Sequence, residues 1–201
     1  GKTIMTVEPK FVPADGVVIQ LKDSVSLKVR MVDCVGYIVE GALGHEENGK
    51  QRLVSTPWSK DAMTFEEAAE IGTKKVIRDH STIGVVVITD GSVTGIERGS
   101  YIEAEERVID ELKSMNKPFV VILNSLTPKD EKTEILRNEL EEKYEVPILP
   151  VNVEQMEEPD IENILETVLY DFPLNEIRIN ISKWVEGLEK NHWIKESIIS
   201  T

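Results

Sequence analysis

An Asp-x-x-Gly pattern follows an apolar, β-branched stretch near the start of the chain. In the letters VRMVDCVGY, Asp33 comes directly after the stretch Leu27–Val32, and Gly36 comes three residues later. In nucleoside triphosphatases of the phosphate-loop class, such an aspartate holds the Mg²⁺ shell, and the glycine N–H detects the γ-phosphate. Taken alone the pattern is weak, because an aspartate that ends a strand is often a turn residue. The surrounding elements favour the nucleotide interpretation.

Asn124 and Ser125 end a second apolar stretch, PFVVILN, where a nucleotide base could be contacted. GTPases of this architecture place an Asn-Lys-x-Asp motif at this point, and its aspartate pairs with the N–H groups of guanine. Thr127 stands in the position of that aspartate and has no carboxylate to accept the two hydrogen bonds. The guanine-specific contact is therefore missing, and a strand-end turn explains Asn124 equally well when it is taken alone.

Of the other notable residues, one predicts slow catalysis and the rest have simpler structural explanations. A catalytic glutamine usually follows the Asp-x-x-Gly pattern in small GTPases, but Tyr37 stands there, so the sequence predicts slow turnover. Cys34 is better explained as a small core residue than as a nucleophile, because no histidine lies near it in the sequence. The turn Thr89–Gly91 lies where parallel sheets bind ligands, although a plain turn explains it equally well. Two further sets are best explained as solvated residues: His45, His80 and His192, and the helix face Glu103, Glu105, Glu106, Asp110 and Glu111.

The elements that must position these residues follow an α/β order. Val17–Leu21 and Leu27–Val32 predict an antiparallel hairpin around the turn Lys22–Ser24. A long polar stretch, Gly41–Thr64, follows without clear periodicity, and a capping box at Thr64–Glu67 then begins a helix. Beyond it the pattern predicts strands at 83–88, 118–124 and 147–151, and helices at 65–77, 102–115, 130–144 and 161–170. This order predicts a three-layer, mostly parallel sheet with helices on both faces, in which a strand such as Ile83–Ile88 is buried on both sides.

Composition excludes several classes of function. The 201 residues carry a net charge of −14, which argues against a nucleic-acid-binding surface and against general attraction to anionic lipid. A single cysteine excludes an internal disulfide and fits a reducing compartment. The longest apolar runs are too short to span a bilayer, and no signal peptide is visible.

A set of longer segments adds a family resemblance. The segments GKTIMTVEPKFVP, VRMVDCVGY, EEAAEIGTKKVI, DHSTIGVVVITDGS, YIEAEERVIDELK and NHWIKES closely resemble, in this order, the stage IV sporulation protein A family. The resemblance runs over essentially the whole chain. It implies a fold of the P-loop, translation-factor-related GTPase class adapted to ATP and Mg²⁺. It also implies a morphogenetic ATPase of endospore-forming bacteria, which assembles on the forespore surface as the base of the spore coat.

The resemblance also assigns residues. Gly1–Pro9 matches the first switch region of the family, and Thr6 matches a threonine that senses the γ-phosphate and can approach Mg²⁺. The family often has a second threonine next to it, whereas this chain has Val7. Asp33 matches the acidic residue linked to Mg²⁺. Because the phosphate loop and first strand of the family lie upstream, we expect residues 1–201 to be a fragment that is inactive by itself.

The expected domain boundaries follow from the same comparison of patterns. Residues 1–172 are predicted to form the truncated nucleotide-binding domain, and residues 173–201 a linker and the start of a following domain. In that tail, Asn175–Ile181 is predicted to be a strand and Trp184–Ile194 to begin a helix. Without the first strand, the strands at 27–32 and 83–88 would present unpaired backbone groups. We therefore expect this fragment not to remain a simple native monomer.

Two functions stay open at this stage. The first is an ATPase whose hydrolysis drives polymerisation into a static coat scaffold, in the mother-cell cytoplasm at the outer forespore surface. Its expected partners are further copies of itself, other spore coat proteins and, through the rest of the protein, the forespore membrane as a peripheral contact. The second is a non-catalytic interaction domain that docks coat proteins, which Tyr37 in place of a glutamine favours.

Overall fold

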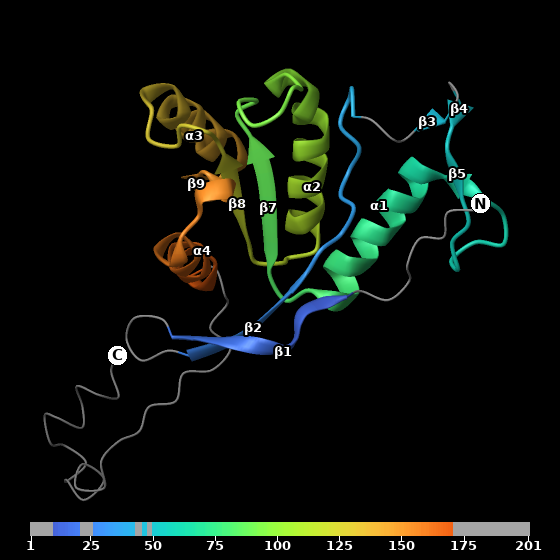
Figure 1. Cartoon of the computed structure of the whole chain (residues 1–201), viewed down its shortest axis with the longest axis horizontal. Coiled ribbons are helices and arrows are strands. Elements are labelled where there is room, and N and C mark those ends of the chain that lie inside the picture. The colour runs from blue at the N-terminus through green and yellow to red at the C-terminus, as the bar shows by residue number, and fades with distance from the viewer. Residues whose placement is uncertain (1–9, 21–25, 43–45, 48–49, 171–201) are drawn as a thin grey trace, which may run out of the picture.

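The computed structural model describes residues 10–20, 26–42, 46–47 and 50–170. Helices and strands alternate along most of this length (Figure 1). The strands are β1 Phe11–Gln20, β2 Ser26–Val32, β3 Glu46–Glu47, β4 Lys50–Gln51, β5 Leu53–Val54, β6 Met63–Thr64, β7 Gly84–Thr89, β8 Phe119–Asn124 and β9 Ile148–Val151. The helices are α1 Phe65–Lys75, η2 Val76–His80, η3 Arg98–Tyr101, α2 Ile102–Ser114, α3 Glu131–Tyr144, η4 Val153–Gln155 and α4 Glu158–Tyr170.

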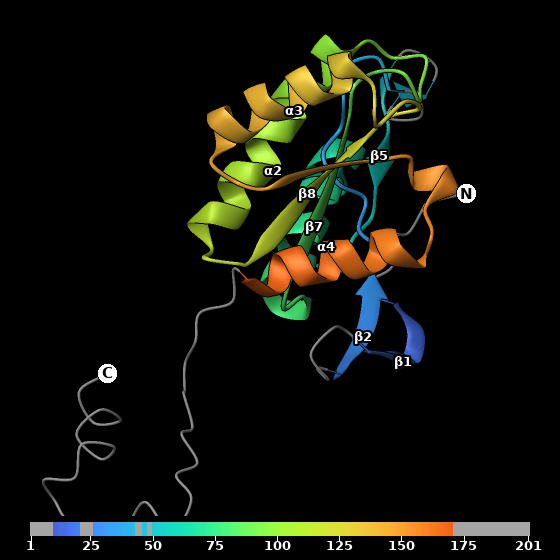
Figure 2. The same cartoon turned by 90° about the vertical axis from the view of Figure 1, so that its left-hand side faces the viewer.

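A parallel sheet with the strand order β7-β8-β9 forms the centre of the molecule. Its middle strand β8 is buried on both faces, as its unbroken apolar sequence predicts. Val121 and Leu123 pack with α2 and α3 on one face, whereas Val120 and Ile122 pack with α4 on the other (Figure 2). Each such side chain contributes about 1.5–3 kcal/mol by leaving water. The α/β class, the parallel sheet and helices on both faces are confirmed.

The prediction that the strand at 83–88 is buried on both faces is wrong for β7. Val86 and Ile88 are buried against α2, but Val85 is 47% and Val87 57% exposed. The register pairs Val85 with Val120 and Val87 with Ile122, so all four lie on the same face of the sheet. Among the described residues, α4 covers this face over β8 and no helix covers it over β7. β7 is also one of the two edge strands of the sheet in the described part of the chain.

The hairpin predicted from the first apolar stretches is confirmed as the antiparallel pair β1–β2. β1 begins at Phe11, earlier than predicted, and a bulge between Val12 and Val17 interrupts its register. Gly16 at φ +75° lies in this bulge, where a left-handed backbone favours glycine. In the described residues the hairpin forms its own two-stranded sheet and does not pair with β7. The turn predicted at Lys22–Ser24 lies outside the described residues.

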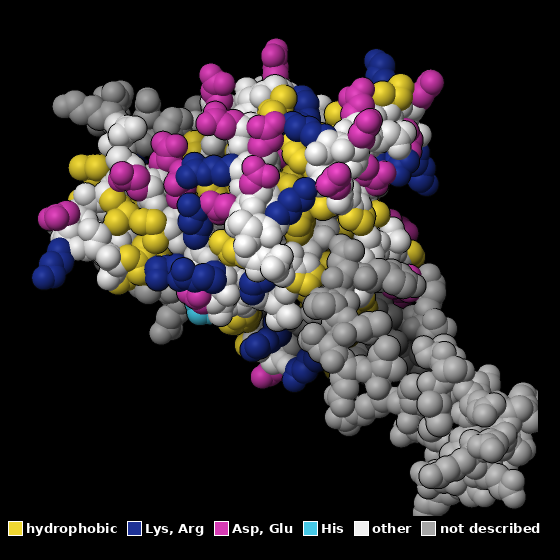
Figure 3. Space-filling model, turned by 180° about the vertical axis from the view of Figure 1, so that it is seen from behind, with side chains coloured by type: hydrophobic (Ala, Val, Ile, Leu, Met, Phe, Trp, Pro, Cys, Tyr) yellow, Lys and Arg dark blue, Asp and Glu magenta, His cyan; other side chains and the backbone are white. Residues whose placement is uncertain are grey.

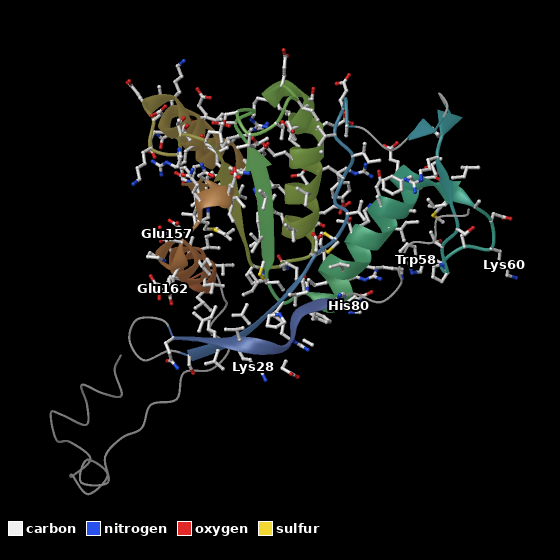
Figure 4. The ribbon with its side chains drawn as sticks, viewed as in Figure 1. Lys28, Trp58, Lys60, His80, Glu157 and Glu162 are labelled. Atoms are coloured by element: carbon white, nitrogen blue, oxygen red, sulfur yellow. The ribbon has the colours of Figure 1, made fainter. Side chains whose placement is uncertain are left out.

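Helix α1 begins as the capping box predicts. Thr64 Oγ1 accepts the N–H of Glu67 at 3.2 Å, and the Glu67 carboxylate accepts the N–H of Thr64 at 3.0 Å. Trp58 lies beside the helix at Gly72, where a Cβ would come within 3.3 Å of the ring (Figure 4). The preceding polar stretch contains two short ladders, β3–β4 and β5–β6, which its sequence does not predict.

The acidic face predicted for α2 is only partly solvated. Glu105 is 3% exposed, and its carboxylate lies 2.7 Å from the Arg98 guanidinium and accepts a hydrogen bond from the Tyr144 hydroxyl at 2.6 Å. Burial and this acidic neighbour raise the pKa of Tyr144. Glu111 is also paired, as described below. The interpretation of these two glutamates as solvated is therefore wrong, because each has cationic and phenolic partners on other elements.

Charges of both signs are interspersed on one face of the molecule. Figure 3 shows Lys and Arg side chains lying among Asp and Glu side chains on the face it presents. No helix in the described part of the chain is long and apolar enough to cross a membrane. The strand and helix predicted at 175–181 and 184–194 lie outside the described residues.

Candidate functional site

The segment that carries Asp33 and Gly36 leaves β2 and runs between α1 and α2 (Figure 1). Asp33 is exposed to solvent. Gly36 adopts φ +79°, and nothing lies within 4 Å of the place where a Cβ would be, so the backbone conformation and not crowding favours glycine. Its N–H donates to Thr73 Oγ1 at 3.0 Å, and the Thr73 hydroxyl lies 3.3 Å from the Gly36 carbonyl. Thr73 on α1 therefore fixes the position of Gly36.

Tyr37 ties the same segment to α2. Its hydroxyl donates to the Glu111 carboxylate, which also lies 2.9 Å from the Lys74 ammonium. Burial raises the pKa of Glu111, and these two donors favour its charged form. The Arg107 guanidinium lies 4.9 Å from the centre of the Tyr37 ring and forms a bidentate ion pair with Glu70. The segment is thus held by side chains of two helices rather than by strand pairing.

Two smaller features complete this part of the molecule. Burial raises the pKa of the Cys34 thiol, which disfavours the reactive thiolate, but Cys34 is only half-buried and is not one of the buried core residues. An apolar hollow of about 300 Å³ lies farther along the segment. It is lined by Val35, Tyr37 and Val39 of the segment, Phe65 at the start of α1, and Ile96 and Tyr101 before α2.

Asn124 and Ser125 lie at the carboxyl end of β8 and are occupied by internal hydrogen bonds. Asn124 Oδ1 accepts the Val153 N–H at 3.1 Å, which ties β8 to the chain beyond β9. Ser125 is fully buried, and its Oγ accepts the Thr127 N–H at 3.0 Å and lies 3.3 Å from the Thr133 hydroxyl. Sequence reasoning missed Thr133, since a threonine inside a charged helix carries no signal of this contact.

The turn after β7 is built in the same way. Asp90 Oδ1 accepts the N–H and the hydroxyl of Ser92 at 2.8 and 2.6 Å, and Ser92 Oγ accepts the Leu126 N–H at 3.0 Å. Burial alone would raise the pKa of Asp90, but hydrogen bonds from Ser125 and Ser92 outweigh it and lower the pKa. Asp90 is therefore an Asx-turn residue that joins two strand ends. The letters Asp-Gly-Ser are a turn signal, but they do not predict the link to Leu126.

The predicted site residues are not gathered in one place. Tyr37 contacts the last turn of α2, whose Leu112 lies next to Gly84 at the amino end of β7. Asn124, in contrast, lies at the carboxyl end of the middle strand β8, and a six-residue strand spans about 20 Å. Thr6 lies outside the described residues. Within the described ranges, no cluster of three or more His, Cys, Asp or Glu side chains could hold a metal ion. His80 is exposed at the end of η2 (Figure 4), and His45 and His192 lie outside those ranges.

A parallel sheet with helices on both faces is compatible with the fold class of P-loop nucleoside triphosphatases. The family description "Stage IV sporulation protein A, ATPase domain" matches residues 1–173. The chain belongs to the stage IV sporulation protein A family.

Two curated relatives agree with this assignment. The chain is 79% identical over 201 residues to stage IV sporulation protein A of Clostridioides difficile (strain 630), covering all of this chain and 41% of the relative. It is 50% identical over 197 residues to the protein of that name from Bacillus subtilis (strain 168), covering 98% of this chain and 40% of the relative. The chain thus spans about two-fifths of the length of these relatives.

An ATPase domain implies that a nucleotide is used, with Mg²⁺ as its usual partner. Two observations are compatible with a phosphate near the Asp33 segment. The Asp33 carboxylate is exposed, and open space lies beside Gly36, so a phosphate could approach the backbone there. The Gly36 N–H, in contrast, is already bonded to Thr73.

Proposed function

We propose that the full-length protein is a slow ATPase and that its hydrolysis of ATP drives self-association into a polymer. The observation that carries the proposal is the exposed Asp33 with Gly36 directly after β2, in a chain whose first 173 residues match an ATPase domain. Asp33 would hold the water shell of Mg²⁺, and Gly36 would donate its N–H to the terminal phosphate. Thr6 would sense the same phosphate, a role that the resemblance to the family implies. Mg²⁺ would neutralise the charge that develops on the transferred phosphoryl group.

Asn124 and Ser125 would serve the base end of the nucleotide through the loop that they hold. Ser125 is buried, so in this role it would act by fixing the exposed residues Leu126 and Thr127 next to it. Thr127 has no carboxylate for the paired N–H groups of guanine. We therefore propose that the protein prefers ATP to GTP.

The proposed setting is the mother-cell cytoplasm at the outer forespore surface. The relatives' name refers to sporulation, and the strongly acidic chain is unsuited to nucleic acid. The proposed partners are further copies of the protein, other spore coat proteins and, through the rest of the protein, the forespore membrane as a peripheral contact.

Hydrolysis, nucleotide competition and sedimentation of the full-length protein test the proposal. We expect slow phosphate release from ATP, Mg²⁺ dependence, and weak competition by unlabelled GTP. Pelleting of the protein should require hydrolysable ATP and should fail with a non-hydrolysable analogue. Equal or better competition by GTP would contradict the base assignment, and pelleting that is independent of nucleotide would contradict the coupling of hydrolysis to assembly.

A second candidate is a non-catalytic domain that docks coat proteins. The contact of Tyr37 with Glu111 favours it, because Tyr37 stands where small GTPases have a catalytic glutamine and its hydroxyl is already used in a structural hydrogen bond. This candidate predicts that the full-length protein binds its partners equally well with and without ATP and releases no phosphate. The hydrolysis assay above separates the two.

A further inference from the structure

The Thr73 hydroxyl is hydrogen-bonded to the backbone of Gly36, which is distant in the sequence. A threonine inside a helix ordinarily turns its hydroxyl to a carbonyl one turn back. Thr167 on α4 does this, with its hydroxyl 2.7 Å from the Asn163 carbonyl. The Thr73 hydroxyl instead meets both polar backbone groups of Gly36, which lies 37 positions away in the sequence. Because Thr73 is only 1% exposed, water does not compete strongly for this contact.

The neighbouring contacts hold the segment from the same side. Tyr37 is hydrogen-bonded to Glu111, and the Arg107 guanidinium lies over its ring. Gly36 is therefore attached to α1 through Thr73, and Tyr37 is attached to α2. Nothing lies within 4 Å of the place where a Cβ on Gly36 would be. The Gly36 peptide therefore has a partner on α1 and is not crowded at its Cα.

We propose that Thr73 is a positioning residue that withholds the Gly36 N–H from phosphate, and that nucleotide binding exchanges the Thr73 hydroxyl for a phosphate oxygen. The inference rests on the proposed function, because it takes Gly36 as a phosphate contact. One N–H makes one strong hydrogen bond, so the two acceptors exclude each other. The strength of the Thr73 contact thus sets part of the cost of binding ATP.

The expected effect follows from the net strength of a protein hydrogen bond. Removing the Thr73 hydroxyl takes its oxygen acceptor from the Gly36 N–H in the nucleotide-free protein and leaves the Cys34 sulfur, a weak acceptor, as the neighbour of that N–H. ATP then binds about three- to tenfold more tightly. Thr73→Val keeps the shape of the side chain without the hydroxyl, whereas Thr73→Ser keeps the hydroxyl. Thr167→Val is the matched control, because it removes a hydroxyl that bonds only within its own helix.

The experiment measures the affinity of each full-length variant for a fluorescent ATP analogue and, without nucleotide, hydrogen exchange of the Gly36 amide. We expect Thr73→Val to bind the analogue three- to tenfold more tightly and to exchange the Gly36 amide faster by a similar factor. Thr73→Ser and Thr167→Val should match the wild type in both measurements. Thr73→Ala repeats the test if valine prevents folding.

Each outcome decides the matter. Unchanged or weaker binding in both hydroxyl-free variants, or tighter binding that Thr73→Ser shares, would overturn the role of Thr73 while the wild type still binds ATP. If the wild type itself binds no ATP, the proposed function and this inference are both wrong.

Discussion

Two regions of the molecule carry the polar residues that the sequence singles out, and they are held in opposite ways. At the strand ends, Asn124, Ser125 and Asp90 satisfy their polar atoms with groups of the loops that follow the sheet. The segment Asp33–Tyr37 follows a strand outside that sheet and is attached by the side chains of Thr73 and Glu111.

We infer from this difference that the strand ends support the fold, whereas the segment Asp33–Tyr37 responds to nucleotide. Ser125 and Thr133 form a buried hydrogen-bonded pair, which is costly to disturb, so we expect the strand ends to behave as a rigid frame. A backbone segment held by a few side-chain contacts can be released at the cost of those contacts alone. We therefore expect mutations at the strand ends to change stability, and mutations in the segment to change the use of nucleotide.

The largest effect is expected at Asp33. In the full-length protein, Asp33→Ala should lower the rate of ATP hydrolysis by about 10²–10³-fold, because the carboxylate proposed to hold the water shell of Mg²⁺ is lost. Its melting temperature should stay the same, since the side chain is exposed. Asp61→Ala, at another exposed aspartate, serves as the control. Turnover close to the wild-type rate would remove Asp33 from the mechanism.

The second largest effect is expected on stability, when a core side chain of β8 is shortened. Leu123 is fully buried between β8 and the helices of its face, so Leu123→Ala should lower the free energy of unfolding by about 2–5 kcal/mol. Val87→Ala on the neighbouring strand should cost far less, because Val87 is 57% exposed. Urea unfolding measures both. Equal losses at the two positions would mean that the open face of β7 is covered in the protein studied.

A smaller loss is expected at Ser125. Ser125→Ala leaves the Thr127 N–H without its acceptor and should cost about 1–3 kcal/mol. Ser114→Ala, at an exposed serine of α2, should stay within about 0.5 kcal/mol of the wild type. The same unfolding experiment reports both values, and an unaffected Ser125→Ala would show that the strand ends are not a rigid frame.

The smallest effect concerns pH. The pKa of Asp90 is lower in the folded protein than its ordinary value of 3.8, so its charged form stabilises the fold above that value. This stabilisation is lost as the pH falls through the folded-state pKa. Asp90→Asn should therefore melt below the wild type at pH 6, and the gap should narrow between pH 4 and pH 2. A gap that is constant with pH would exclude the charge of Asp90 as its cause.

The sequence predicted those parts of the fold whose signals are local. The capping box at Thr64, the doubly buried strand at Phe119–Asn124 and the helix after Asp130 depend on residues close to one another in the chain. The exposure of Val85 and Val87 depends on which element covers β7, and an apolar strand sequence does not specify that.

The site was less predictable for a related reason. Asp33 and Gly36 stand out by their spacing, but their partners do not. Thr73 and Glu111 contact the segment across 37 and 74 positions, and a threonine or a glutamate in an amphipathic helix is ordinary. Glu105 looked solvated for the same reason, because its partners Arg98 and Tyr144 come from other elements.

Hydrogen exchange of the full-length protein with and without ATP tests the contrast between the two regions most directly. We predict that saturating ATP and Mg²⁺ change the exchange rate of the Gly36 amide by about tenfold, because its hydrogen-bond partner is replaced. The Thr127 amide, which Ser125 already holds, should change much less. An unchanged Gly36 amide under saturating ATP, or a larger change at Thr127, would contradict the account.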